Sequence, residues 1–115
     1  MNSYALLAVA IALNAVGQLL LKRATLGQEA GAGAGAVFFS PWFVAGVGSL
    51  GLSMLLWVQV LRKIPLTIAH PLSGAAFVIV PVAAHLIWRE PLSTTRIAGI
   101  VVIVTGIALV ARGAT

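Results

Sequence analysis

Three polar side chains recur at every fourth position near the beginning of the chain: Asn14, Gln18 and Lys22. On a helix this spacing places them on one face, with Gly17 beside them. Two amides and an ammonium group can hold a polar or anionic ligand by hydrogen bonds and charge. A stripe of hydrogen bonds to a neighbouring helix explains the same pattern. Both interpretations, a ligand-binding track and a packing stripe, stay open at the level of sequence.

A second polar set follows at the same spacing. Ser49, Ser53 and Trp57 are four residues apart and share a helix face. Serine hydroxyls can bond back to the carbonyls of their own helix, which favours a structural role for both serines. Trp57 precedes Arg62 and Lys63 by less than two turns, so it fits an anchor at the membrane interface. Ser53 and Trp57 are also candidates for contact with a substrate.

Two prolines interrupt the third apolar stretch of the chain. Pro71 and Pro81 each remove a backbone donor, and a patch of small residues from Ser73 to Ala76 lies between them. Interrupted helices at membrane depth occur where they line a cavity or pack on protein, and transporters use them at binding sites. Ser73 is therefore a candidate substrate-binding residue. The alternative is a kink that only shapes the helix bundle.

His70 stands beside this interruption. It shares a narrow arc of the helical wheel with Phe77 and Pro81. An imidazole can donate or accept a hydrogen bond, and histidine changes its charge between about pH 5 and 8. His70 is therefore the better functional candidate, whereas His85 is assigned to the membrane interface.

Composition indicates where these residues must lie. Of the 115 residues, 61% are hydrophobic and only 8% are charged, whereas a soluble domain is about one quarter charged. A membrane-spanning helix needs about 20 apolar residues to cross about 30 Å of hydrocarbon. Four charge-poor stretches meet this requirement, the fourth because Arg96 can snorkel outward. The predicted spans are residues 3–21, 41–61, 64–88 and 93–112.

The predicted fold is an all-α integral membrane protein of four transmembrane helices in two hairpins, a single domain over residues 1–115. Alternating Gly and Ala residues predict a flexible loop over residues 24–39. Ser40 and Ser93 are predicted N-caps of the second and fourth helices, and Pro41 fits the first helical position.

The basic side chains divide almost evenly between the two membrane faces. Arg62, Lys63 and Arg112 fall on one face, and Lys22, Arg23, Arg89 and Arg96 fall on the other. Because an excess of Lys and Arg on one side sets orientation, this near balance predicts an antiparallel dimer or an orientation dictated by a partner.

The fourth helix offers a surface for such a partner. Gly99, Ile103 and Gly106 share one face, where the missing side chains let a second helix approach closely. We interpret this face as a dimer seam in preference to packing within the chain. The candidates for attracting an anionic headgroup are Arg23, Arg62, Lys63 and Arg89.

Several function classes are disfavoured. The net charge of +5 comes from basic residues that flank apolar spans, which argues against nucleic-acid binding and for contact with lipid headgroups. The sequence contains no cysteine, so it offers no disulfide framework and no thiolate metal site. No nucleophile–base pair is visible, so we predict no enzyme activity, catalytic residue, metal or cofactor. The first apolar segment is long enough to span, so we expect a retained helix and not a cleaved signal peptide.

Three stretches carry a family resemblance: Asn14 to Lys22, Ile64 to His70, and Gly99 to Gly106. They resemble the small multidrug resistance transporters, which implies a four-helix protein acting as an antiparallel dimer within the drug/metabolite transporter superfamily. That family has an essential membrane carboxylate at the position of Asn14. An amide cannot exchange a proton for a cation, so proton-coupled drug export through this residue is not expected.

Four further stretches carry a closer resemblance: Gly17 to Leu19, Gly51 to Met54, Ile68 to Pro71, and Trp88 to Ser93. They are similar to the EamA-like four-helix branch of the same superfamily, which includes the small subunits of the aminoarabinose–undecaprenyl phosphate flippase.

This resemblance implies a transporter or flippase subunit of the bacterial inner membrane that moves a polyprenyl-phosphate-linked sugar or related lipid between leaflets. It would act as a homodimer or as a heterodimer with a related small subunit, and Asn14, Gln18 and His70 would supply hydrogen bonds across the membrane. One alternative is a small multidrug-type exporter of small cations or metabolites, coupled to protons through His70. The other is a non-transporting structural subunit of a membrane assembly.

Overall fold

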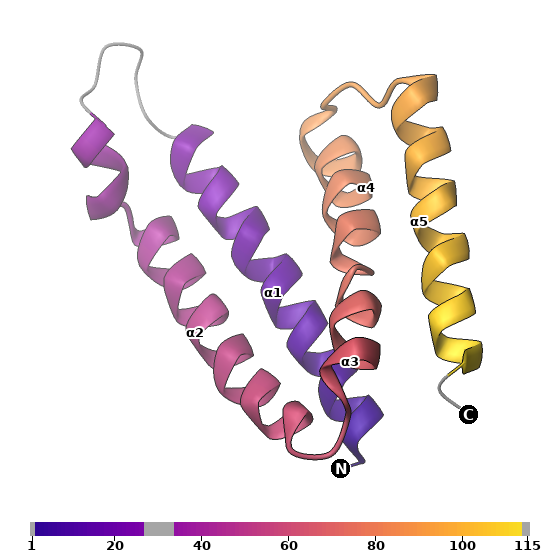
Figure 1. Cartoon of the computed structure of the whole chain (residues 1–115). Helices are drawn as coiled ribbons and strands as arrows, with labels where there is room; N and C mark the ends of the chain where they lie inside the picture. Colours follow the sequence, from indigo (N-terminus) through magenta and orange to yellow (C-terminus); the bar gives the residue numbers. More distant parts are fainter. Residues whose placement is uncertain (1, 27–33, 114–115) are drawn as a thin grey trace.

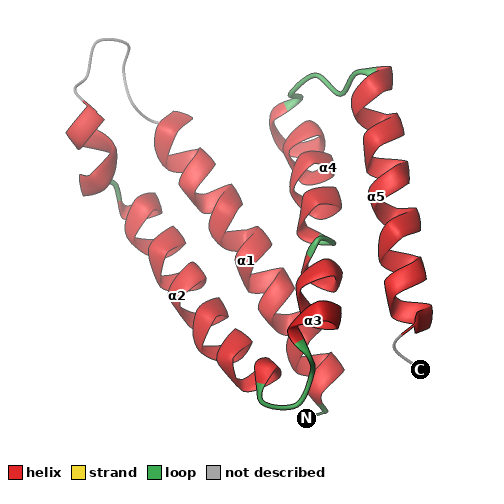
Figure 2. Cartoon of the chain, in the orientation of Figure 1, coloured by secondary structure: helices red, strands yellow, loops and turns green. Residues whose placement is uncertain are grey.

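The computed structural model describes residues 2–26 and 34–113 of the chain, and no strand occurs among them (Figure 2). The elements in chain order are α1 (Ser3–Leu26), the 3-10 helix η1 (Ala34–Phe39), α2 (Pro41–Leu61), α3 (Leu66–Ser73), α4 (Ala76–Trp88) and α5 (Thr94–Gly113). Much of the predicted loop over residues 24–39, including Glu29, lies outside the described residues. The described ends of that segment are helical and belong to α1 and η1.

Four helical segments of the described residues are long and apolar enough to cross a membrane: Ser3–Leu26, Pro41–Leu61, Leu66–Trp88 and Thr94–Gly113. They confirm the four predicted spans, and the protein is a multi-pass membrane protein. The first helix ends at Leu26 and not near residue 21. No glycine or proline occurs from Gln18 to Leu26, so the helix continues past Lys22 and Arg23.

Side-chain caps start two of the helices as the sequence predicts. The Ser40 hydroxyl accepts a hydrogen bond from the Trp42 amide at 3.2 Å, and Pro41 occupies the first helical position of α2. The Ser93 hydroxyl accepts one from the Arg96 amide, also at 3.2 Å, immediately before α5. These bonds satisfy amides that have no partner inside the helix.

The helices form two hairpins that lie side by side (Figure 1). Helix α1 packs along α2, while α5 packs against α3 and α4. The beginning of α1, the α2–α3 turn and the end of α5 lie at one end of the molecule, as four antiparallel spans require. Helix α1 also contacts α3 and α4, so it joins the two hairpins.

Two glycines allow the close approach of α1 and α2. A methyl group added at Gly17 would lie 2.7 Å from Leu50 Cγ and 3.2 Å from the Gly46 carbonyl oxygen. One added at Gly46 would lie 2.9 Å from Leu21 Cδ2 and 3.2 Å from the Gly17 carbonyl oxygen. Each backbone therefore occupies the space that a side chain on the other helix would need, which is how small residues join helices in membranes.

Helix α5 is held differently, because none of its residues is buried. Large apolar side chains face outward on it and on the other helices; Val102 is 70% exposed and Leu86 is 73% exposed. Apolar surface of this extent on a protein marks contact with a membrane or another protein. In lipid it contacts acyl chains, as spanning helices require.

We predict that Gly17→Ala destabilises the α1–α2 hairpin by about 1–3 kcal/mol, because overpacking forces neighbouring groups to move. Thermal unfolding in detergent, followed by circular dichroism, should show a lower midpoint. The matched control is Gly48→Ala in α2, where an added methyl group meets no atom within 4 Å. Equal midpoints for the two variants would contradict the close contact.

Candidate functional site

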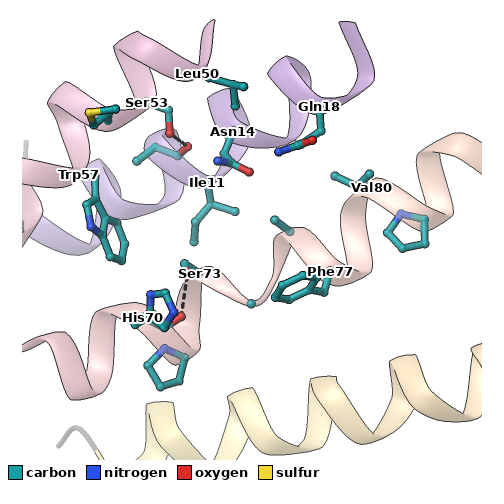
Figure 3. A pocket seen from close by; sticks show the side chains of 16 residues that line it. Ile11, Asn14, Gln18, Leu50, Ser53, Trp57, His70, Ser73, Phe77 and Val80 are labelled. Carbon is teal, nitrogen blue, oxygen red and sulfur yellow. Dashed lines mark hydrogen bonds between the residues drawn. The ribbon is translucent and has the colours of Figure 1, made fainter. Parts of the chain in front are cut away.

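A cavity of about 980 Å³ lies between the α1–α2 hairpin and the interrupted helix α3–α4. Its lining residues come from α1, α2, α3, α4 and the junction at Gly74. Six of the residues predicted to contact a substrate line it: Asn14, Gln18, Ser53, Trp57, His70 and Ser73. Figure 3 shows their side chains around the shared space. The structure thus brings together residues that are far apart in the sequence.

The α1 wall presents two amides to this cavity. Neither the Asn14 nor the Gln18 side chain has a hydrogen-bond partner among the described residues, and neither is buried. Within the described residues the two amides therefore form no hydrogen-bonded packing stripe with a neighbouring helix. Each amide has donors and an acceptor.

The serines of α2 tie that helix to α1. The Ser53 hydroxyl donates to the Ala10 carbonyl oxygen at 2.8 Å, and the Ser49 hydroxyl donates to the Leu13 carbonyl oxygen at 2.7 Å. The expectation that serine hydroxyls bond back to their own helix is therefore wrong for this pair. The close approach at Gly17 and Gly46 brings the α1 carbonyls within reach. Ser49 does not line the cavity, whereas Ser53 does.

The interrupted helix forms the opposite wall. Helix α3 ends at Ser73 and α4 begins at Ala76, so the break falls at Gly74 and Ala75 and not at either proline. The Gly74 amide donates to the Pro71 carbonyl oxygen at 3.0 Å, three residues back. The Gly74 amide therefore does not reach the His70 carbonyl oxygen four residues back. The Ser73 hydroxyl donates to that oxygen instead, at 2.5 Å.

Gly74 is required at this break. A methyl group added there would lie 2.8 Å from the Pro71 carbonyl oxygen. The tightened turn brings that carbonyl against the Cα atom, so a side chain does not fit. The sequence prediction of an interrupted helix is correct, but its position depends on glycine as much as on proline. Pro81 lies inside α4, where the helix continues.

Two rings meet at one end of the cavity. The Trp57 indole and the His70 imidazole lie edge to face, with centroids 6.2 Å apart and an interplanar angle of 69°. Trp57 belongs to α2 and His70 to α3, so the ring pair spans the two walls. Trp57 therefore lies in the cavity wall. His85 lies outside the cavity lining, in the last turn of α4, and its Nδ1 donates to the Glu90 carbonyl oxygen at 2.8 Å.

The basic residues lie outside the cavity lining. Lys22 Nζ is 3.1 Å from Glu90 Oε1, and the Arg23 guanidinium lies 5.0 Å from the Trp42 ring centroid. Arg62 donates to the Gln59 side-chain oxygen at 3.1 Å. Lys63 and Arg89 are exposed. Lys22 is thus the predicted substrate-binding residue that the cavity does not include.

Sequence reasoning missed two features of the site. Ile11, Met54 and Val80 contribute apolar lining that resembles any other apolar position of a spanning helix. The second feature is the ion pair of Glu90, between α4 and α5, with Lys22 of α1, for which the sequence analysis named no partner. Among the described residues, no group of three or more His, Cys, Asp or Glu side chains could hold a metal ion.

Comparison with known proteins agrees with this architecture. The model of the EamA-like transporter family matches residues 1–112. The chain belongs to this family. Membership of the EamA-like transporter family indicates a role in membrane transport.

The chain is also similar to individual bacterial proteins. The chain is 37% identical over 109 residues, 95% of its length and 96% of the relative's, to a protein of Yersinia pseudotuberculosis serotype O:1b (strain IP 31758). That protein is named probable 4-amino-4-deoxy-L-arabinose-phosphoundecaprenol flippase subunit ArnE. A protein of the same name from Yersinia pestis (strain Pestoides F) has the same identity and coverage. One from Erwinia tasmaniensis is 38% identical over 68 residues, 59% of this chain and 63% of its own. No solved structure matches the chain at a significant level.

We predict that Ser53→Ala weakens the α1–α2 wall by about 0.6 kcal/mol, the average for hydrogen bonds between membrane helices, and by at most about 1.7 kcal/mol. The substitution removes the buried hydrogen bond to the Ala10 carbonyl oxygen. The change in the free energy of unfolding is measured in mixed micelles. Thr105→Ala is the comparison variant, because its exposed hydroxyl bonds to the Val101 carbonyl oxygen of its own helix. If Ser53→Ala leaves the α1–α2 pairing unchanged, the bond between helices carries no stability.

Proposed function

We propose that this protein is a subunit of a flippase that moves a polyprenyl-phosphate-linked sugar, or a related lipid, between the leaflets of the bacterial inner membrane. The observation that carries the proposal is the pair of unpartnered amides, Asn14 and Gln18, in a cavity at membrane depth. Polar groups in hydrocarbon cost free energy unless they bind something. The similarity to proteins named as subunits of such a flippase supports the same substrate class.

The cavity suits a headgroup that carries hydroxyls. The Asn14 and Gln18 amides and the His70 ring offer both donors and acceptors. Met54 and Phe77 line the same cavity and are 64% and 69% exposed, so they form an apolar margin toward lipid. In our proposal the sugar passes along the polar wall while the prenyl chain stays among the lipid tails.

The basic residues at the two ends of the bundle would attract the phosphate. Arg23 and Arg89 lie near one end, and Arg62 and Lys63 lie near the other. Exposed cations at a membrane surface draw anionic headgroups toward it. Each leaflet would thus offer a docking point on the way into or out of the cavity.

Transport without covalent chemistry fits the serines of the site. The Ser53 and Ser73 hydroxyls both donate to backbone carbonyl oxygens and not to the His70 ring. In this arrangement neither serine is activated by a base, as nucleophilic catalysis requires. We therefore propose that the chain is not an enzyme and uses no cofactor.

We also propose that the chain works as a dimer, with a second copy or with a related small subunit. The seam would be the α5 face of Gly99, Ile103 and Gly106. A methyl group added at Gly99 or Gly106 meets no atom within 4 Å, so this face is open within the chain. One chain encloses its cavity from three spans only, which leaves room for a partner to complete it.

Lipid flipping in proteoliposomes tests the proposed function. Asn14→Leu should lower the flipping rate of the undecaprenyl-linked sugar roughly tenfold, equivalent to about 1.4 kcal/mol in the transition state. The matched control is Val16→Leu on the exposed face of the same helix, which should flip at the unmodified rate. If Asn14→Leu and Lys22→Ala both flip the lipid at the wild-type rate, the ligand-binding track of Asn14, Gln18 and Lys22 is refuted.

A second candidate function is export of small cations coupled to protons through His70. The position of His70 in the cavity wall, beside the Trp57 ring, is the observation that favours it. Aromatic faces bind organic cations. Adding tetraphenylphosphonium to the detergent-solubilised protein should then release protons between about pH 5 and 8, and His70→Gln should abolish the release. No release over this range would exclude this function.

A further inference from the structure

An ion pair joins the two hairpins at one end of the molecule. Lys22 lies near the end of α1, and Glu90 lies in the corner between α4 and α5; Nζ is 3.1 Å from Oε1. The two side chains are 43% and 42% exposed. Water screens a pair of this kind, so it adds little to stability and can be exchanged without unfolding the protein.

Lys22 continues the polar face of the cavity. Asn14 and Gln18 line the cavity, and Lys22 follows one turn later, about 6 Å along the helix axis. Figure 3 shows Gln18 and Val80 toward one end of the cavity and Trp57 and His70 toward the other. The ion pair therefore lies beyond the Gln18 end of the cavity.

Glu90 is held in place by its own corner. The His85 ring donates to the Glu90 carbonyl oxygen at 2.8 Å, and Arg96 Nη1 donates to the Pro91 carbonyl oxygen at 2.8 Å. Arg89 turns the chain in a left-handed conformation, with φ 56°. The corner is thus fixed on both sides of Glu90, and its carboxylate is presented to Lys22 as an internal anion.

We propose that the Lys22 ammonium is a phosphate-binding site that Glu90 occupies in the resting protein. A phosphate ester is an anion with oxygen acceptors, as a carboxylate is, so it can replace Glu90 on the ammonium. The exchange releases α1 from the α4–α5 corner and opens the Gln18 end of the cavity to the headgroup. This inference rests on the proposed function, because a phosphate-linked lipid supplies the competing anion.

Access to the cavity tests the site directly. Because the sequence contains no cysteine, a Val80→Cys substitution provides a single reporter near the Gln18 end. The protein is placed in phosphatidylcholine nanodiscs and labelled with a water-soluble maleimide. Adding Glu90→Gln should raise the labelling rate severalfold, because Lys22 loses its partner.

Two controls isolate the ion pair. The exchanged pair, Lys22→Glu with Glu90→Lys, keeps both charges in contact and should restore slow labelling of Val80→Cys. A Met54→Cys reporter lies on the turn of α2 that bonds to α1 through Ser53 and Ala10, and its labelling should not respond to Glu90→Gln.

Two phosphate probes then identify the ligand. Undecaprenyl phosphate in the nanodisc should raise the labelling of Val80→Cys severalfold and leave the Glu90→Gln variant unchanged. A response to this lipid but not to inorganic phosphate assigns the site to a lipid headgroup, and a response to both assigns it to the phosphate group itself.

The proposal is overturned if Glu90→Gln labels at the same rate as Val80→Cys alone, if the exchanged pair labels as fast as Glu90→Gln, or if neither phosphate probe changes the labelling rate of Val80→Cys. If Glu90→Gln does not fold, the two phosphate probes on Val80→Cys still decide. Protein that opens with undecaprenyl phosphate but does not flip the undecaprenyl-linked sugar would refute the proposed function and leave the phosphate site standing.

Discussion

The structure depends on one constraint: inside hydrocarbon, every backbone amide and carbonyl must find a partner within the protein. Unbroken helices meet it along most of the chain. The junction between α3 and α4 meets it locally, because the Gly74 amide bonds to the Pro71 carbonyl and the Ser73 hydroxyl bonds to the His70 carbonyl. An interruption satisfied in this way can stand at membrane depth. The cavity lies along this interrupted helix.

The opposite wall of the cavity is the α1–α2 hairpin, whose two helices pack closely. Gly17 and Gly46 let α1 and α2 approach until the hydroxyls of Ser49 and Ser53 reach carbonyl oxygens on α1. One wall of the cavity is thus a hairpin joined by backbone contact, and the other is a helix broken in the middle. Between these two walls, it is the Gly74 junction that departs from regular helical hydrogen bonding.

The spans and two helix caps could be predicted from the sequence because they depend on neighbours a few residues away. Runs of apolar residues, Ser40 before Pro41, and Ser93 before α5 are local signals, and the structure confirms them. The sharing of one cavity by Asn14, Ser53 and His70 follows from helical spacing once the spans pair as hairpins.

Other features could not be predicted because they depend on which helices meet and at what height. The ion pair of Lys22 with Glu90 joins the first helix to the last corner, and no local pattern encodes that distance. The bonds from Ser49 and Ser53 to α1 depend on a helix separation that the two glycines determine. The tightened turn at Gly74 leaves no room for a side chain beside the Pro71 carbonyl oxygen, and this closeness becomes visible only when the turn is built in space.

Helix α5 has a consequence for how the protein is made. It has no buried residue, and no residue after Pro81 lines the cavity. During synthesis on the ribosome, every wall of the cavity is therefore present before the last span leaves the exit tunnel. The outward face of α5 can therefore vary without changing a residue that lines the cavity.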